Sequence, residues 1–289
     1  MQRLALIAVL AAIVLPAGAA AQPRVVADVP MEFYGTRPAV EVMVNGKGPY
    51  LFLIDTGASG QARADASLVK ELGLASVGEA QADDRSGGQG ARLDEVRLDY
   101  ITLAGVRFDG VQAFSRNYNT STYLPKISGI LGLGLFEPYL LTLDYPGRRV
   151  RLEIGELPPA DGKTVLPFER EDALAYIRVQ VGDEPVKAVI DSGNVRGFDM
   201  PSEAIRRQPL ASYPSLIGKG ASANGEQDLK QVELADEVRI GMHRITPAVV
   251  TFSDSFEDTN LGSTWMRSFV VTLDQKTKRV RFVRPRPRK

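Results

Sequence analysis

The sequence predicts an all-β fold made of two homologous lobes with small helices. The first observation is an internal repeat: two blocks of the first half recur, in the same order, in the second half. The second observation is that each half contains short runs rich in branched and aromatic residues, separated by Gly, Pro, Asn and Asp. Such runs favour strands, and the residues between them favour turns.

The repeat defines the limits of the lobes. In one pair of blocks Gly132 falls on Gly262, a shift of 130 residues, and in the other Asp55 falls on Asp191, a shift of 136. Similar blocks at nearly equal shifts indicate duplication. We therefore expect a signal peptide over 1–21, an N-terminal lobe over 25–155, a linker over 156–164, a C-terminal lobe over 165–285 and a basic tail over 286–289.

Each lobe should consist of strands joined by turns, with one short helix. Strands are expected over 42–44, 50–54, 96–103 and 150–154. A helix is predicted over 67–73, with Ser67 as its N-cap and Gly73 at its end, and a matching helix over 202–207.

The N-terminus has the composition of a secretory signal peptide. A short charged start precedes an apolar run from Leu4 to Leu15 and a small-residue segment that ends at Ala21. The apolar run is too short to span a bilayer comfortably, and no later run is long enough. We expect cleavage after Ala21, export, and no stable membrane insertion.

The cysteine content indicates the cellular compartment and excludes some kinds of catalytic site. The chain has no cysteine, which excludes disulfides, a cysteine peptidase and a lipid on an N-terminal cysteine. Exported chains without cysteine are commoner in the bacterial periplasm than among small eukaryotic secreted domains. We expect a bacterial protein that is periplasmic or extracellular.

The charge balance and the histidine content argue against further classes of binding partner and of catalytic site. Lys plus Arg equals Asp plus Glu at 35 each, which argues against nucleic acids or anionic membranes as partners. The one histidine, His243, cannot build a zinc site or a serine triad without a second histidine or a cysteine. We expect no metal and no other cofactor.

Two aspartates at the ends of apolar strands are the candidate chemical groups. Asp55 follows 50–54 and Asp191 follows 186–190, and each is followed by a small hydroxyl residue and a glycine. A carboxylate at the end of a buried strand costs desolvation energy unless it is paired or hydrogen-bonded. If the lobes pack about a pseudo-twofold axis, the two carboxylates meet and share one proton, because both cannot ionise at close range.

The residues beside the aspartates suit this arrangement. Gly57 and Gly193 have no side chain, so the backbone can turn tightly and approach the opposite carboxylate. Thr56 and Ser192 supply hydroxyls that can hydrogen-bond the main chain of the opposite loop. We expect these four residues to support the pair of aspartates.

These residues carry a resemblance to a known family. The motifs Ile54-Asp-Thr-Gly-Ala-Ser59, Ile190-Asp-Ser-Gly193 and Ile130-Leu131-Gly132 resemble those of aspartic peptidases of the pepsin and retropepsin type, most closely the bacterial exported retropepsin-like proteins. Shared protons between paired aspartates are the established feature of that family. With its second copy, the likeness covers nearly all of residues 37–283.

The resemblance implies a fold and an activity. The fold would be two acid-protease-type β-barrel lobes with the active site in the cleft between them. The activity would be that of an aspartic endopeptidase, hydrolysing peptide bonds through a water activated by Asp55 and Asp191. The substrate would be a polypeptide in extended conformation. Because duplication supplies both aspartates in one chain, we expect a monomer.

The family also has a glycine-bearing hairpin, the flap, that closes over the bound peptide. The segment 84–90 lies about where a flap would fall, which makes Ser86, Gly87 and Gly88 the flap candidates. The segment 218–225 is its counterpart in the second lobe. Glycines of this kind also suit any exposed hairpin.

Two departures from the family pattern leave a second function open. Asn194 stands where the first lobe has Ala58, and Asn260 replaces an apolar residue of the expected second copy of 130–132, which weakens that strand. The alternative is a catalytically silent protein that binds peptides on the same fold. Neither aspartate is replaced, which favours the peptidase.

Overall fold

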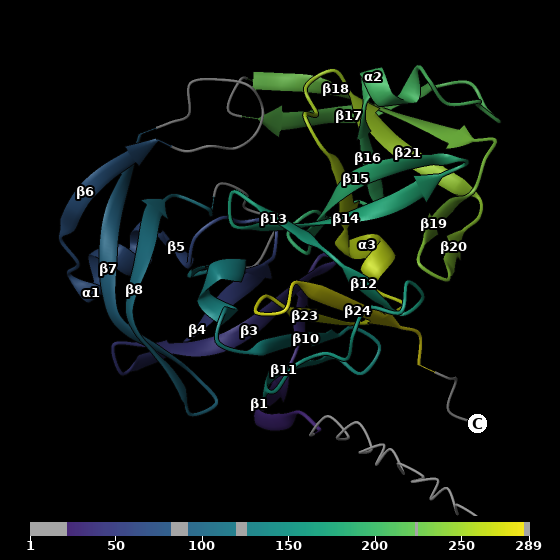
Figure 1. Cartoon of the computed structure of the whole chain (residues 1–289). Coiled ribbons are helices and arrows are strands. Elements are labelled where there is room, and N and C mark those ends of the chain that lie inside the picture. The colour runs from purple at the N-terminus through teal and green to yellow at the C-terminus, as the bar shows by residue number, and fades with distance from the viewer. Residues whose placement is uncertain (1–21, 82–91, 120–125, 223–224, 286–289) are drawn as a thin grey trace, which may run out of the picture.

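The computed structural model describes residues 22–81, 92–119, 126–222 and 225–285. Its strands lie in three sheets of eight, ten and six strands. The prediction of a mainly β chain with small helices is confirmed. The strand pairings define three sheets and no closed barrel among the described residues, so the predicted β-barrel form of the lobes stays a prediction. In Figure 1 the eight-stranded sheet lies on the left, the ten-stranded sheet at the upper right, and the six-stranded sheet below them.

The eight-stranded sheet is formed by the first half of the chain. Its strands are β2 (Glu32–Tyr34), β3 (Arg37–Val44), β4 (Lys47–Asp55), β5 (Ala62–Asp65), β6 (Ser76–Gln81), β7 (Arg92–Leu103), β8 (Val106–Arg116) and β9 (Gly129–Gly132). All four predicted strand segments fall within strands, and the fourth lies in β11 of the six-stranded sheet.

The ten-stranded sheet is formed by the second half. Its strands are β13 (Glu169–Glu171), β14 (Leu174–Val181), β15 (Glu184–Asp191), β16 (Phe198–Pro201), β17 (Ser215–Ser222), β18 (Gly225–Leu234), β19 (Val238–Ile240), β20 (His243–Ile245), β21 (Ala248–Ser253) and β22 (Thr259–Gly262).

The two sheets share one strand order. From one edge the first runs β6-β7-β8-β5-β9-β4-β3-β2. The second runs β17-β18-β21-β16-β22-β15-β14 in the equivalent order, with β13 paired to β14, and continues from β14 to β19 and β20. In both, the strand that ends on an aspartate pairs in parallel with a short strand that ends on a glycine. The partners are Asp55 and Gly132 in the first sheet, and Asp191 and Gly262 in the second.

The six-stranded sheet joins the two halves. It runs β1 (Arg24–Pro30), β11 (Arg149–Ile154), β10 (Leu140–Asp144), β23 (Val270–Asp274), β24 (Arg279–Val283) and β12 (Val165–Pro167). At its centre β10 pairs antiparallel with β23, so that Thr142 lies opposite Thr272. Their buried hydroxyls share a 2.9 Å hydrogen bond. This pairing ties residues 130 positions apart into one sheet.

The helices are short, and one cap differs from the prediction. Helix α1 (Ala66–Leu72) ends at Gly73, whose φ of 67° permits the left-handed cap. Its N-cap is Asp65 and not Ser67, because the Asp65 carboxylate accepts a 3.0 Å hydrogen bond from the Ser67 backbone N–H. Helix α2 (Ser202–Ile205) is shorter than the predicted 202–207.

Each half contains one further helical turn that the sequence analysis missed. They are the 3-10 helix η1 (Leu133–Phe136) and helix α3 (Ser263–Met266), which directly follow β9 and β22. Both turns bury apolar side chains. On α3, Trp265 stacks on Phe269 with ring centroids 4.4 Å apart, so it belongs to the core packing.

The core is continuous between the halves. One cluster of buried side chains contains Phe52 and Phe136 of the first half together with Phe269 and Phe282 of the second. Close packing in this shared core fixes the positions of the sheets relative to each other. It thereby fixes the positions in space of the C-terminal ends of β4 and β15. Among the described helices, none has the length and apolar composition needed to cross a membrane.

Candidate active site

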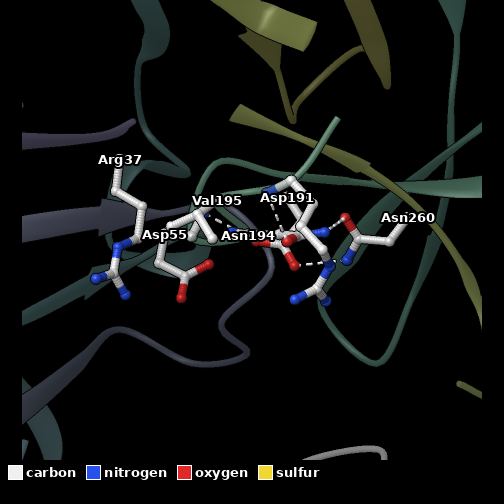
Figure 2. Close-up of a pocket in the computed structure, with 8 residues that line it drawn as sticks. Arg37, Asp55, Asp191, Asn194, Val195 and Asn260 are labelled. Carbon is white, nitrogen blue, oxygen red and sulfur yellow. Dashed lines mark hydrogen bonds between the residues drawn. The ribbon is translucent and has the colours of Figure 1, made fainter. Parts of the chain in front are cut away.

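The two aspartate loops lie against each other. Asp55 is the last residue of β4 and Asp191 the last residue of β15. The three residues before each aspartate are buried, and the aspartate side chains keep partial exposure. Figure 2 shows both side chains at one cavity, reached from two different sheets. The structure therefore brings together the two carboxylates that the sequence singled out.

Thr56 and Ser192 lock the loops together by four reciprocal hydrogen bonds. The Thr56 hydroxyl donates to the carbonyl of Ile190 at 2.7 Å and accepts from the Ser192 backbone N–H at 3.0 Å. The Ser192 hydroxyl donates to the carbonyl of Ile54 at 2.7 Å and accepts from the Thr56 backbone N–H at 3.0 Å. Both side chains are fully buried. The loops thus have little freedom to separate.

Gly57 and Gly193 provide close approach, as the sequence analysis expected. A Cβ atom placed on Gly57 would lie 2.5 Å from Asp191 Oδ1, and one placed on Gly193 would lie 2.5 Å from Asp55 Oδ1. Both distances are far shorter than van der Waals contact. Each glycine is therefore needed to seat the opposite carboxylate.

The two carboxylates have different hydrogen-bond partners. Asp55 Oδ1 accepts a 2.9 Å hydrogen bond from the Gly57 backbone N–H. Asp191 Oδ1 accepts from the backbone N–H groups of Gly193 at 2.9 Å and Asn194 at 3.0 Å. Asp191 Oδ2 accepts a further 2.6 Å hydrogen bond from the Asn260 side-chain amide. Donors favour the charged form of an acid, so negative charge is better satisfied at Asp191.

Electrostatics keep a proton on the pair. Burial by the surrounding protein raises the pKa of Asp55 first, and the charge of Asp191 and a hydrogen bond with Asp191 raise it further, to about 8. The Gly57 N–H and the cation of Arg63 oppose this rise. Burial and the neighbouring carboxylate therefore favour retention of a proton by the pair at a pH at which an isolated aspartate is ionised.

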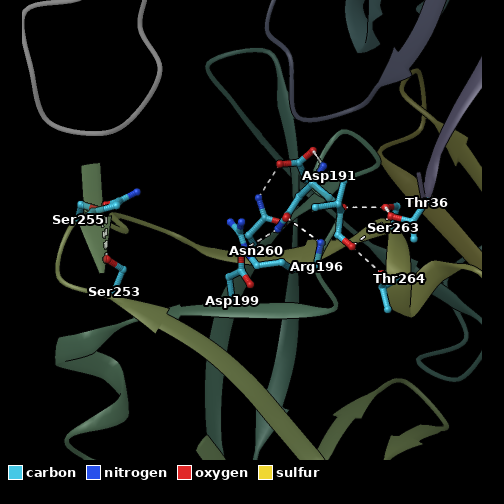
Figure 3. Close-up of polar contacts among 12 residues, drawn as sticks. Thr36, Asp191, Arg196, Asp199, Ser253, Ser255, Asn260, Ser263 and Thr264 are labelled. Atoms are coloured by element: carbon cyan, nitrogen blue, oxygen red, sulfur yellow. Dashed lines mark hydrogen bonds and ion pairs between the residues drawn. The ribbon is translucent and has the colours of Figure 1, made fainter. Parts of the chain in front are cut away.

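Asn194 and Asn260, the two departures from the family pattern, form one network. The Asn194 side-chain amide donates to Asn260 Oδ1 at 2.8 Å and to Asp199 Oδ2 at 2.9 Å. Arg196 Nε donates to the same Asp199 oxygen at 2.6 Å. The contacts run from Asp191 through Asn260 and Asn194 to Asp199 and Arg196, and Figure 3 shows this part of the molecule. Asn260 keeps the β22 pairing and adds a donor to Asp191, and the weakening of this strand stays a prediction.

The network is specific to the second half. Asn260 pairs with Asp199 across β22 and β16, whereas the equivalent position of the first half pairs Ile130 with Arg63 across β9 and β5. The first half therefore has an apolar side chain and a cation where the second has an amide and an acid. The sequence around Asp199 contains no motif that indicates a role for this residue at the site.

Tyr145 is a neutral neighbour of the pair. Its side chain is buried, and its hydroxyl has no hydrogen-bond partner among the described residues. Burial, followed by the charges of Asp191 and Asp55, raises the pKa of Tyr145 above its ordinary value. The phenol therefore stays protonated at any working pH.

The cavity above the carboxylates has a volume of about 300 Å³. Its walls come from both halves and from the loop after β15; they are Arg37, Asp55, Asp191, Gly193, Asn194, Val195, Arg196 and Asn260. Within the described part of the chain, no three His, Asp or Glu side chains gather as metal ligands. The lining thus includes both carboxylates and the side chain of Asn260.

The predicted flap residues Ser86, Gly87 and Gly88 lie outside the described residues. The strands on either side, β6 and β7, pair antiparallel, with Gln81 opposite Arg92. In the second half β17 and β18 form the matching hairpin, up to the pair of Ser222 and Gly225. The flap assignment stays a prediction.

A comparison with models of protein families matches part of the first half of the chain. The model of a family described as aspartyl protease matches residues 40–135, from β3 to η1. The matched segment includes the Asp55 loop and β9, and Asp191 lies beyond it. A search of curated proteins found no match to this chain. Residues 40–135 are therefore similar to the aspartyl protease family.

Proposed function

We propose that this protein is an aspartic endopeptidase whose Asp55 and Asp191 activate a water molecule for peptide-bond hydrolysis. One observation carries the proposal. Two carboxylates from equivalent loops lie against each other's glycine, and the high pKa of Asp55 leaves the pair with one proton. A pair in this state contains a base and an acid at one reacting centre.

The donors around each carboxylate assign the roles. Asp191 accepts three hydrogen bonds from nitrogen donors and is the ionised base. Asp55 accepts one such bond, from Gly57, and carries the proton. In the first step Asp191 takes a proton from water, the water oxygen attacks the peptide carbonyl carbon, and Asp55 gives its proton to the carbonyl oxygen.

The second step completes the hydrolysis. Asp191 delivers its proton to the amide nitrogen as the carbon–nitrogen bond breaks, and Asp55 recovers a proton from one hydroxyl of the tetrahedral intermediate. The products are a carboxylic acid and an amine, and the pair returns to its starting state. This sequence requires no metal, cofactor or covalent intermediate.

Several features support this chemistry. The hydrogen bonds of Thr56 and Ser192 hold the loops in register, which keeps the carboxylates in the geometry that both proton transfers need. The cavity between the halves suits a peptide in extended conformation, bound through main-chain hydrogen bonds. The flap candidates would close over that peptide.

We further propose that the protein works outside the cytoplasm, in the periplasm or beyond the cell. The apolar segment before Ala21 supports this proposal, and N-terminal sequencing of the exported protein tests it. One chain supplies both aspartates, which supports a monomer.

Paired substitutions test the peptidase. Asp55→Asn and Asp191→Asn should each abolish cleavage of an unstructured protein at mildly acidic pH, without loss of the fold. Asp109→Asn is the matched control, because Asp109 is an exposed residue of β8 that pairs with Arg107. Undiminished cleavage by either active-site variant would refute the mechanism.

The same assay separates the alternative function. Peptide binding with no cleavage of a diverse library between about pH 3 and pH 8 would favour a silent peptide-binding protein. Retention of both carboxylates and their hydrogen bonds supports the peptidase, since binding alone needs neither.

A further inference from the structure

Two arginines flank the carboxylate pair in the same cavity. Arg37 is the first residue of β3, and Arg196 lies in the loop after Asp191. Apart from Asp55 and Asp191, they are the only charged side chains among the described residues that line this cavity. Neither has a role in the hydrolysis steps.

Arg37 has no ion-pair partner among the residues that the structure describes. Its Nε donates to the carbonyl of Tyr34 at 3.4 Å, and its guanidinium carbon lies 4.7 Å from the centre of the Tyr34 ring. These contacts position the side chain. Its two terminal nitrogens make no hydrogen bond or ion pair with any residue that the structure describes. The cation acting on the pKa of Asp55 is Arg63, from another strand.

Arg196 is already balanced. Its Nε binds Asp199 at 2.6 Å, and its guanidinium carbon lies 5.2 Å from the centre of the Phe256 ring. The net positive charge beside the pair therefore comes from Arg37, and Arg196 adds oriented N–H groups.

The arginines are held at the seam between the halves. The hydroxyl of Thr36, next to Arg37, donates to the carbonyl of Val195 at 3.1 Å and shares a 2.6 Å hydrogen bond with Ser263. These contacts join the turn before β3 to the loop that carries Arg196. A ligand group here would meet a site that is already organised.

We propose that Arg37, with Arg196 alongside, binds a carboxylate of the peptide substrate next to the scissile bond, so that the protein selects acidic peptides. A planar guanidinium binds carboxylates through two parallel hydrogen bonds. The carboxylate would come from an Asp or Glu side chain, or from the C-terminus of the peptide. This inference rests on the proposed peptidase function.

Matched peptides test the selection. After the cleavage site of one peptide has been mapped by mass spectrometry, three versions are compared. The first has Glu beside the scissile bond and an amidated C-terminus, and the second has Gln there and the same terminus. The third has Gln and ends, with a free carboxylate, close to the scissile bond. We expect kcat/KM to be roughly tenfold to a hundredfold higher for the first or the third version than for the second, mainly through KM. Preference for the first version identifies an acidic side chain as the source of the carboxylate, and preference for the third identifies the C-terminus.

Variants then assign the effect. Arg37→Gln should remove the preference, Arg37→Lys should retain part of it, and Arg37→Glu should shift it towards peptides with Lys at that position. Arg178→Gln is the matched control: Arg178 is an exposed residue of β14 paired with Glu169, outside the cavity, and its loss should leave the preference unchanged. An unchanged preference in Arg37→Gln and Arg37→Glu would overturn the inference.

Binding measurements separate this inference from the peptidase proposal. Fluorescence anisotropy with Asp55→Asn reports the affinity for the same peptides without turnover. If the wild-type protein cleaves nothing but the carboxylate preference in binding depends on Arg37, the peptidase proposal fails and the inference stands. If cleavage occurs with equal efficiency and equal binding for acidic and neutral peptides, the inference fails and the peptidase stands.

Discussion

Asn260 donates a 2.6 Å hydrogen bond to the Asp191 carboxylate, from the strand position that Ile130 occupies beside Asp55. The two halves share their strand order and loop geometry, so this substitution makes an otherwise symmetric pair of carboxylates unequal. The added donor favours negative charge on Asp191, and the raised pKa of Asp55 places the proton on the other side.

Replacement of Asn260 tests this inequality. Asn260→Leu introduces an apolar side chain, as the first half has at Ile130, and removes the donor to Asp191. Loss of one charge-assisted hydrogen bond should lower kcat roughly tenfold to a hundredfold and leave KM little changed. The low-pH limb of activity should also move to higher pH, because a proton would be added to the base more readily. The measurement is the pH profile of kcat.

Ile130→Leu is the matched control for that experiment, because it changes only the branching of a side chain in the first half. Asn260→Gln keeps the amide and tests for partial rescue. A low-pH limb that stays in place in Asn260→Leu would assign Asn260 a purely structural role.

The pKa of Asp55 predicts how stability varies with pH. The folded value of about 8 lies above the ordinary 3.8, so between these values the folded state keeps a proton that the unfolded state has released. This contribution is fully present below about pH 4 and is lost as the pH rises towards 8. The free energy of unfolding should fall across this window by an amount on the order of a few kcal/mol.

Asp55→Asn has no proton to lose, so its stability should depend less on pH. The variant should match the wild-type protein near pH 4 and exceed it near pH 8, as measured by urea unfolding. Asp109→Asn, which alters an exposed ion pair, should follow the wild-type curve. Parallel curves for Asp55→Asn and the wild-type protein would contradict the assignment of the proton.

The reciprocal hydrogen bonds of Thr56 and Ser192 predict a cooperative loss of stability. Thr56→Val leaves the Ser192 N–H and the Ile190 carbonyl buried without this partner. Each unpaired buried group costs about 1–3 kcal/mol. We therefore expect a large fall in the free energy of unfolding, with a similar fall for Ser192→Ala.

The conservative exchanges Thr56→Ser and Ser192→Thr keep both hydroxyls and serve as controls. The double variant Thr56→Val with Ser192→Ala should cost less than the sum of the single variants, because the two residues share partners. Additive losses would show that the hydroxyls act independently.

The sequence predicted the parts of the site that depend on strand period and repetition. An apolar strand that ends on Asp55, and its copy that ends on Asp191, required only local patterns and one shift between copies. The parallel pairing with the strands that end on Gly132 and Gly262 follows from the same repeat. These features recur in the structure because equivalent sequences bury equivalent faces.

Contacts between distant side chains could not be read in this way. The Asn260 amide reaches an aspartate 69 positions earlier, and its pattern in the sequence indicated only a weaker strand. The N-cap was misplaced for a related reason. Asp65 and Ser67 are both good capping residues, and the choice between them depends on where β5 ends. Tertiary packing decides both cases.

The closest approach between the loops gives the sharpest steric test. A methyl group on Gly57 would lie 2.5 Å from Asp191 Oδ1, and one on Gly193 would lie 2.5 Å from Asp55 Oδ1. Gly57→Ala or Gly193→Ala must therefore displace the opposite carboxylate. A displacement of about 1 Å costs roughly a hundredfold in rate, so each variant should lose most of its activity. Gly197→Ala is the control, because a Cβ atom there meets no heavy atom within 4 Å. Circular dichroism should show that all three variants keep their strands, while only Gly197→Ala keeps its kcat/KM. Full activity in Gly57→Ala would mean that the carboxylates do not need this seating, and the arrangement proposed for catalysis would be wrong.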